Sequence, residues 1–213
     1  MKYKAIIFDC DGTLLNTVSD LTNAVNYALE KLGFPQQTDE ETLKMVGNGI
    51  KVLVFRALPE NKKNFTDEAL SYFKEYYGTH FADKTMPYDG VCDLLKSLKK
   101  SGYKIALVSN KNARYLELLV KKFFSEDLDF WIGETDGLLP KPAPDMVNKA
   151  LEFLQISAEE AVYVGDSPVD VSTAKNSELD GIFVSWGFCT EEQLFSCGAK
   201  TVISAPQELL KMV

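Results

Sequence analysis

The sequence has few of the residues that build thiolate or imidazole metal sites. It contains a single histidine, His80, and its four cysteines are scattered, with no CxxC pair and no histidine in metal-ligand spacing. This spacing argues against a zinc site or a CxxC redox centre. We interpret the cysteines as packed thiols of a reducing compartment. They are Cys10, Cys92, Cys189 and Cys197.

Long apolar runs and a basic surface are also absent. No apolar run approaches the roughly 18 residues that a membrane-spanning helix needs, and the first residues do not resemble a secretion signal. The 213 residues include 23 basic and 31 acidic side chains, which give a formal net charge of −8. This balance argues against a general binder of nucleic acid or anionic membranes. We therefore expect a cytoplasmic protein, a monomer or a homodimer, whose partner is a small molecule.

Two like charges follow directly after the first apolar run. The run is AIIF, residues 5–8, and "FDCDGT" places Asp9 and Asp11 on either side of Cys10. A short continuous apolar run predicts a strand covered on both faces, as in a parallel sheet. Two close carboxylates stay ionised only beside a cation or hydrogen-bond donors. The pair is either an acidic turn or part of a charged site.

Residues 17–81 contain helical patterns and no convincing strand. Apolar residues recur with a period of 3.6 in residues 17–32, and Thr38 with Glu41 forms a capping-box pattern before a second helix. Two further helices are predicted, over residues 50–58 and from Thr66 onward. We interpret residues 16–83 as a small helical domain inserted into the rest of the chain.

From Pro87 onward, predicted helices and strands alternate. Such alternation with short connections is typical of βαβ units and a parallel sheet. The sequence therefore predicts an α/β fold: a Rossmann-like, doubly wound parallel sheet core of residues 1–15 and 84–213, with the all-helical domain as a cap inserted after the first strand.

Polar residues follow three of the predicted strands. In parallel sheets, ligands bind at the carboxyl ends of the strands near the point where the strand order reverses. The first strand supplies Asp9 and Asp11, a second supplies Ser109, Asn110 and Lys111, and a third supplies Asp166, with Asp170 one helical turn later; the loop "PKPAPD" adds Lys141. Each residue alone could serve as a helix cap, a turn residue or a surface charge. Together they indicate a site.

This set of side chains suits phosphoryl transfer. Carboxylates from two strands form a hard oxygen site of the kind that binds Mg²⁺. A lysine and a hydroxyl supply positive charge and a donor to phosphoryl oxygens. One carboxylate can act as nucleophile, and the other, two residues later, can protonate the leaving oxygen and then deprotonate water.

Four motifs, in order, resemble those of the haloacid dehalogenase-like phosphatases: DCDGT, VSNK, KPAPD and GDSPVD. The resemblance implies Asp9 as nucleophile and Asp11 as general acid and base. It also implies that Ser109, Asn110 and Lys141 bind the phosphoryl group. The implied Mg²⁺ ligands are Asp9, Asp166 and the backbone carbonyl of Asp11, supported by Asp170. Many relatives have asparagine directly before the last aspartate, where this chain has Pro168 and Val169.

The inserted segment resembles the cap of phosphoglycolate phosphatases. The likeness lies in "VGNGIKVLVFRAL", residues 46–58, and in "YYG", residues 76–78. Backbone amides of the turn Gly47, Asn48 and Gly49 could receive a substrate carboxylate at a helix N-terminus, and Arg56 could pair with it. The alternative is a plain turn between helices, with Arg56 in solvent.

The leading hypothesis is a Mg²⁺-dependent phosphatase for a small metabolite, with 2-phosphoglycolate as the first candidate. A pyrophosphatase or a sugar phosphomutase would use the same chemistry. A non-enzymatic, receiver-like module would also combine an acidic site, an acceptor aspartate, a hydroxyl and a lysine. Such a module has no use for Asp11 as a leaving-group acid or for a cap.

Overall fold

The structure, a computed structural model, describes residues 2–213 and divides into two compact units. One unit contains residues 2–15 and 87–213, and the other contains residues 16–86. The second unit was predicted at residues 16–83. Among residues 2–213, no helix combines the length and the apolar character needed to cross a bilayer.

The first unit is built on a six-stranded parallel sheet. The strand order is β5-β4-β1-β6-β7-β8, with all neighbouring pairs parallel. Its strands are β1 (Ala5–Phe8), β4 (Lys104–Asn112), β5 (Phe130–Glu134), β6 (Ala161–Gly165), β7 (Asp180–Val184) and β8 (Val202–Ile203). The α/β prediction is confirmed. β1 is central because the chain first builds the sheet toward β5 and then returns to the other side of β1.

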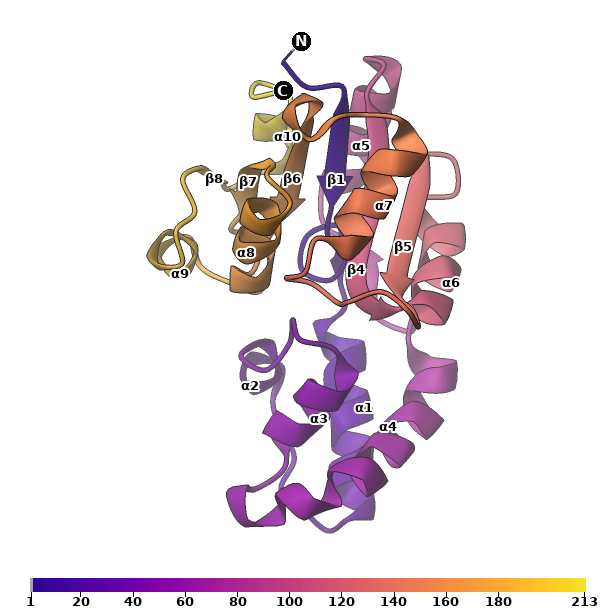
Figure 1. The fold of residues 1–213 in the computed structure, drawn as a ribbon. Coiled ribbons are helices and arrows are strands. Elements are labelled where there is room, and N and C mark those ends of the chain that lie inside the picture. Colours follow the sequence, from indigo (N-terminus) through magenta and orange to yellow (C-terminus); the bar gives the residue numbers. More distant parts are fainter. Residues whose placement is uncertain (1) are drawn as a thin grey trace. The chain divides into compact units, whose positions relative to one another are not determined.

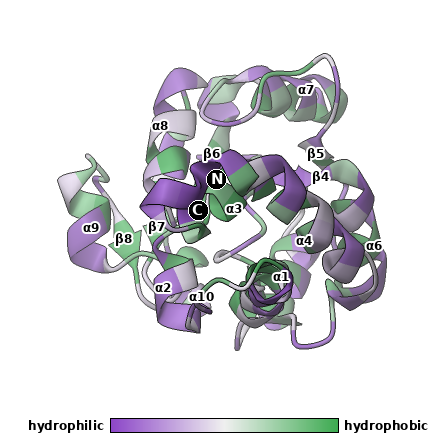
Figure 2. Cartoon of the chain, turned by 90° about the horizontal axis from the view of Figure 1, so that it is seen from below, coloured by the Kyte–Doolittle hydropathy of each residue, from purple (hydrophilic) through white to green (hydrophobic). Residues whose placement is uncertain are grey.

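Helices cover both faces of this sheet (Figure 1). α7 and α8 contact one face, α5 and α6 contact the other, and α9 and α10 pack near β8. The helices are α5 (Val91–Lys100), α6 (Ala113–Phe123), α7 (Asp145–Leu154), α8 (Pro168–Asn176), α9 (Glu191–Ser196) and α10 (Pro206–Leu209), with the short 3-10 helix η2 (Ala158–Glu160) before β6. In Figure 2, α6 and α7 carry both hydrophilic and hydrophobic segments, as amphipathic covering helices should.

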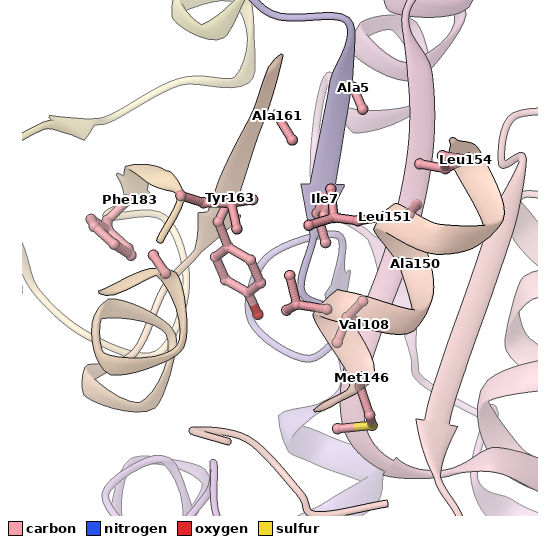
Figure 3. Close-up of a cluster of buried hydrophobic side chains, with 14 of the residues drawn as sticks. Ala5, Ile7, Val108, Met146, Ala150, Leu151, Leu154, Ala161, Tyr163 and Phe183 are labelled. Atoms are coloured by element: carbon pink, nitrogen blue, oxygen red, sulfur yellow. The ribbon is translucent and has the colours of Figure 1, made fainter. Parts of the chain in front are cut away.

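A continuous apolar core lies between the sheet and α7. Alternate strand residues point to opposite faces, so Ala5 and Ile7 of β1 pack with Val147 and Ala150 of α7, while the equally buried Ile6 faces the other way. Figure 3 shows this cluster, in which Tyr163 extends from β6 beside Ile7. The core thereby fixes the strand ends that carry the polar residues.

The second unit is helical. α1 packs against α2 and α4, and α3 packs against α4. Its elements are α1 (Val18–Lys31), α2 (Asp39–Leu43), α3 (Ile50–Ala57), the 3-10 helix η1 (Glu60–Phe65) and α4 (Thr66–His80). The capping box of Thr38 and Glu41 is present. β2 (Leu15–Asn16) and β3 (Met86–Pro87) pair where the chain passes between the units.

Candidate active site

The predicted aspartates lie at the carboxyl end of the central strand. Asp9 follows β1, and its backbone N–H donates to the carbonyl of Val164 on β6 at 2.9 Å. On the other side β1 pairs with β4, with Phe8 opposite Leu107. The strand order changes direction around β1, so residues from β1, β4 and β6 meet at one edge of the sheet.

The Asp9 side chain is a buried carboxylate that forms an ion pair with a lysine. The residue is 7% exposed, and its Oδ1 lies 2.7 Å from Nζ of Lys141. Burial raises the pKa of Asp9 to about 7, although Lys141 acts in the opposite direction. The carboxylate is therefore costly to ionise without a further positive charge.

Lys141 joins two carboxylates. Its ammonium also contacts Oδ1 of Asp170 at 2.8 Å and donates to the hydroxyl of Tyr163 at 3.0 Å. The Tyr163 hydroxyl in turn donates to Asp170 Oδ1 at 2.9 Å. Burial alone would lower the pKa of Lys141, but Asp170 and Asp9 raise it well above its usual value. Lys141 is thus a fixed cation directly beside Asp9.

Asn110 holds the loop that carries Lys141. Its side-chain amide donates to the Lys141 carbonyl at 2.9 Å and accepts from the Lys141 N–H at 2.7 Å. These contacts position the lysine, and the predicted role of Asn110 in phosphate binding stays a prediction. Ser109 is buried beside it, and its hydroxyl accepts from the N–H of Lys111 at 3.2 Å.

Asp166 follows β6 and is held by two donors. Its Oδ1 accepts from the hydroxyl of Thr13 at 2.9 Å, and its Oδ2 accepts from the N–H of Phe188 at 2.7 Å. Burial raises the pKa of Asp166 well above its usual value, and Asp170 and Asp9 add to the effect. Gly12 lies against this carboxylate with φ +90°. A side chain there would overlap Asp166 and would strain the backbone.

Asp170 is fully buried and anchors the start of α8. Its Oδ2 accepts from the hydroxyl of Ser167 at 2.6 Å and from the N–H groups of Ser167 and Asp166 at 3.1 and 3.2 Å. Ser167 is the N-cap, and Pro168 occupies the first turn, where its fixed φ is favourable. Pro168 therefore suits the start of α8.

Three of these carboxylates form a cluster. Asp9, Asp166 and Asp170 are buried, and each places a carboxylate oxygen within 4.8 Å of the others. Buried like charges so close together require a cation or protonation, and hard oxygen ligands suit Mg²⁺. The donor set therefore fits the predicted metal. The Asp11 side chain does not belong to this cluster.

The Asp11 carboxylate contacts Lys111 instead. Nζ of Lys111 lies 3.0 Å from Oδ1 and 3.2 Å from Oδ2 of Asp11, and the lysine side chain is 4% exposed. Lys111 was predicted to follow the strand together with Ser109 and Asn110, without a role of its own. The sequence does contain a signal for this contact. Lys111 directly follows Ser109 and Asn110 at the strand end, and the second acid of the site, Asp11, needs a cation beside it.

The predicted cap residues lie in the second unit. Gly49 is the N-cap of α3 with φ +82°, and Gly47 has φ +111°. Arg56, in the last turn of α3, donates from Nη1 to the carbonyl of Met45 at 2.9 Å. The guanidinium therefore holds the segment that leads into the Gly47–Gly49 turn.

We expect Asp9 to destabilise the metal-free protein as the pH rises. Its pKa is about 7 in the folded protein and 3.8 ordinarily, so the folded state holds the proton more tightly. The bound proton therefore contributes its full share to the free energy of unfolding below about pH 4, and this contribution is lost as the pH rises through about 7. Asp9→Asn should therefore raise the free energy of unfolding more at pH 8 than at pH 5. Urea denaturation in a chelator measures both values, and equal changes at the two pH values would contradict the expectation.

Comparison with known proteins decides the family. The family model of the haloacid dehalogenase-like hydrolases matches residues 6–184. The chain belongs to this family. The resemblance inferred from the four motifs is confirmed, and with it the assignment as an enzyme. This haloacid dehalogenase-like hydrolase is a phosphatase of the phosphoglycolate phosphatase type.

Relatives match the hydrolase over most of its length. A phosphoglycolate phosphatase of Psychrobacter arcticus is 34% identical over 197 residues, which cover 88% of this chain and 86% of the relative. One of Aquifex aeolicus is 31% identical and covers 99% and 96%. A crystal structure from Lactobacillus delbrueckii subsp. bulgaricus, provisionally described as a phosphoglycolate phosphatase, has a TM-score of 0.94, 37% identity and coverage of 100% and 98%.

Proposed function

We propose that this phosphatase hydrolyses a small phosphate monoester through an aspartyl-phosphate and requires Mg²⁺. The observation that carries the proposal is the surrounding of Asp9: a buried carboxylate that touches Lys141 and lies in the cluster with Asp166 and Asp170. The names of the relatives make 2-phosphoglycolate the first candidate substrate.

The first half-reaction assigns a task to each aspartate. An oxygen of Asp9 attacks phosphorus and forms the P–O bond of the aspartyl-phosphate. The ester P–O bond breaks as Asp11 gives a proton to the leaving oxygen, so that the alcohol departs neutral. Lys141, beside Asp9, stabilises the negative charge on the phosphoryl oxygens, and the Ser109 hydroxyl adds a donor.

The second half-reaction regenerates the enzyme. Asp11, now ionised, takes a proton from water, whose oxygen attacks phosphorus. The P–O bond to Asp9 breaks, and inorganic phosphate leaves with the carboxylate restored. Asp170 and Asn110 act on this sequence by holding Lys141 in place.

The metal would be held by Asp9, Asp166 and the backbone carbonyl of Asp11, with Asp170 as support. When bound, Mg²⁺ neutralises the carboxylates and stabilises charge on the transferring phosphoryl group. Asp170 already accepts from Lys141, Tyr163 and the start of α8, so we assign it to holding the site together.

Phosphate release from a panel of esters tests this function. The panel contains 2-phosphoglycolate, ethyl phosphate, a hexose phosphate and pyrophosphate, each with Mg²⁺ and with a chelator. We expect turnover of monoesters that disappears in chelator and returns when Mg²⁺ is added. Equal rates with and without metal would contradict the metal requirement. Turnover of pyrophosphate alone, or transfer of phosphate between hexose positions with little release, would favour the two alternatives in the same chemistry.

A further inference from the structure

Asp166 differs from the other aspartates of the site in its partners. Asp9, Asp11 and Asp170 each form an ion pair with a lysine. Among residues 2–213, Asp166 has no such partner, although it is fully buried. Its two hydrogen-bond donors are a hydroxyl and a backbone N–H, which orient the carboxylate without neutralising its charge. A buried charge of this kind needs a cation, so the groups that orient Asp166 matter for the metal.

The segment of residues 186–188, which follows β7, supplies one of the two donors. β7 pairs with β6, with Phe183 opposite Gly165, so the chain that leaves β7 passes beside Asp166. The N–H of Phe188 donates to Oδ2 of Asp166 at 2.7 Å. A backbone donor moves only with the chain. The path of this segment therefore determines where the hydrogen bond points.

Trp186 connects the same segment to the other donor. Its indole Nε1 donates to the backbone carbonyl of Thr13 at 3.0 Å, and the Thr13 hydroxyl donates to Oδ1 of Asp166 at 2.9 Å. The indole thus holds the residue that orients the second oxygen. Both oxygens of Asp166 depend on the 186–188 segment, one through Phe188 and the other through Trp186 and Thr13.

Gly187 allows the segment to lie directly against the carboxylate. A Cβ at this position would lie 2.2 Å from the carbonyl oxygen of Gly12 and 2.5 Å from Oδ2 of Asp166. Both distances are shorter than van der Waals contact. Because Gly12 also lies against Asp166, the carboxylate is packed between two glycine backbones and has little freedom to turn.

We infer that Trp186 is a positioning residue of the metal site: through the 186–188 segment it holds Asp166 in the orientation that binds Mg²⁺, and so sets the affinity for the metal. The inference rests on the proposed function, of which the Mg²⁺ requirement is a part. The segment lies outside the four motifs and beyond residue 184, where the match to the family model ends. Loss of a group that holds a metal ligand typically weakens metal binding by about 10- to 100-fold.

Binding of Mg²⁺ in the absence of substrate tests the inference. Urea denaturation at a series of Mg²⁺ concentrations gives the dissociation constant from the rise in unfolding free energy. Trp186→Phe keeps an aromatic ring but lacks the N–H donor, and Gly187→Ala pushes the segment away from the carboxylate. The matched control is Trp131→Phe, at the other tryptophan, on the edge strand β5. The dissociation constant should rise by about 10-fold or more in the first two variants and stay unchanged in the control.

Phosphate release gives a second measurement. The Mg²⁺ concentration that gives half of the maximal rate should rise by the same factor in Trp186→Phe. At saturating Mg²⁺, kcat and KM for 2-phosphoglycolate should stay within about twofold of the wild-type values, because excess metal compensates for a ligand that is held less firmly.

The outcomes separate the inference from the function on which it rests. If Trp186→Phe has a lower unfolding free energy but an unchanged dissociation constant, Trp186 only supports the fold and the inference is wrong, while the phosphatase function stands. A wild type that Mg²⁺ does not stabilise, and that releases phosphate equally well in chelator, would overturn the metal requirement itself. Circular dichroism checks folding, and Gly187→Ala carries the same expectation if Trp186→Phe does not fold.

Discussion

Asp9→Asn is expected to reduce kcat by at least about 10³-fold, because the reaction loses its nucleophile. The amide of asparagine fills the same space but carries no charge with which to attack phosphorus. The effect should appear in kcat with every phosphate ester, since the aspartyl-phosphate is common to all of them. Steady-state phosphate release measures the loss. Acid-quenched mass spectrometry should detect a phosphorylated Asp9 in the wild type and none in the variant.

The matched control is Asp136→Asn, which removes a carboxylate from an exposed turn of the same unit. Its rate should equal that of the wild type. If Asp9→Asn kept its activity within tenfold, or carried the phosphoryl group on another residue, the nucleophile would have been assigned wrongly.

Lys141→Met should have the largest effect on stability. The ammonium lies between Asp9 and Asp170 and is almost completely buried. Its loss leaves the acidic cluster without its fixed cation, and breaking a buried ion pair costs about 3–5 kcal/mol of unfolding free energy. Urea denaturation at pH 8 in a chelator measures the loss. The loss should be smaller at pH 5, where protonation relieves the repulsion, and Mg²⁺ should restore part of the stability.

Lys149→Met is the control for this experiment. Lys149 lies on the exposed side of α7 and contacts Glu152 at the surface, where ion pairs contribute little. Its unfolding free energy should match that of the wild type under each condition. If Lys141→Met were as stable as this control, or if Mg²⁺ did not help it more than the wild type, the role of Lys141 as counterion of the cluster would be wrong. In activity assays Lys141→Met should also be inactive, because it lacks the cation beside the attacked phosphorus.

The sheet could be predicted from sequence because its strands are short apolar runs separated by helical patterns. The helix α8 begins at Pro168, where Ser167 and Asp170 form a capping box that the pattern of apolar residues does not reveal. The helix α9 was not predicted, although Thr190 and Gln193 carry the capping-box pattern. β2 and β3 contain two residues each, so only a long-range pairing defines them.

The gathering of Asp9, Lys141, Asp166 and Asp170 was also predictable, because the carboxyl ends of parallel strands meet at one edge. The contacts that each side chain makes at this edge could not be predicted from the sequence. Tyr163 lies within the apolar strand β6, a pattern that predicts a core residue. Its hydroxyl nevertheless contacts Lys141 and Asp170. The amide of Asn110 can bind a phosphate or a backbone equally well, so its contacts with the Lys141 backbone could not be predicted.

The paired contacts between Asn110 and Lys141 have a consequence for how this site tolerates change in chain length. The Asn110 side-chain amide makes the two hydrogen bonds that a peptide group of a neighbouring strand would make. Through these bonds the loop after β5 is attached to β4 at Lys141. The segment before that attachment is exposed, with Leu139 at 63% exposure. Insertions or deletions there would change the loop's outline without moving the lysine. The chemistry is therefore insulated from the surface variation that loops accumulate.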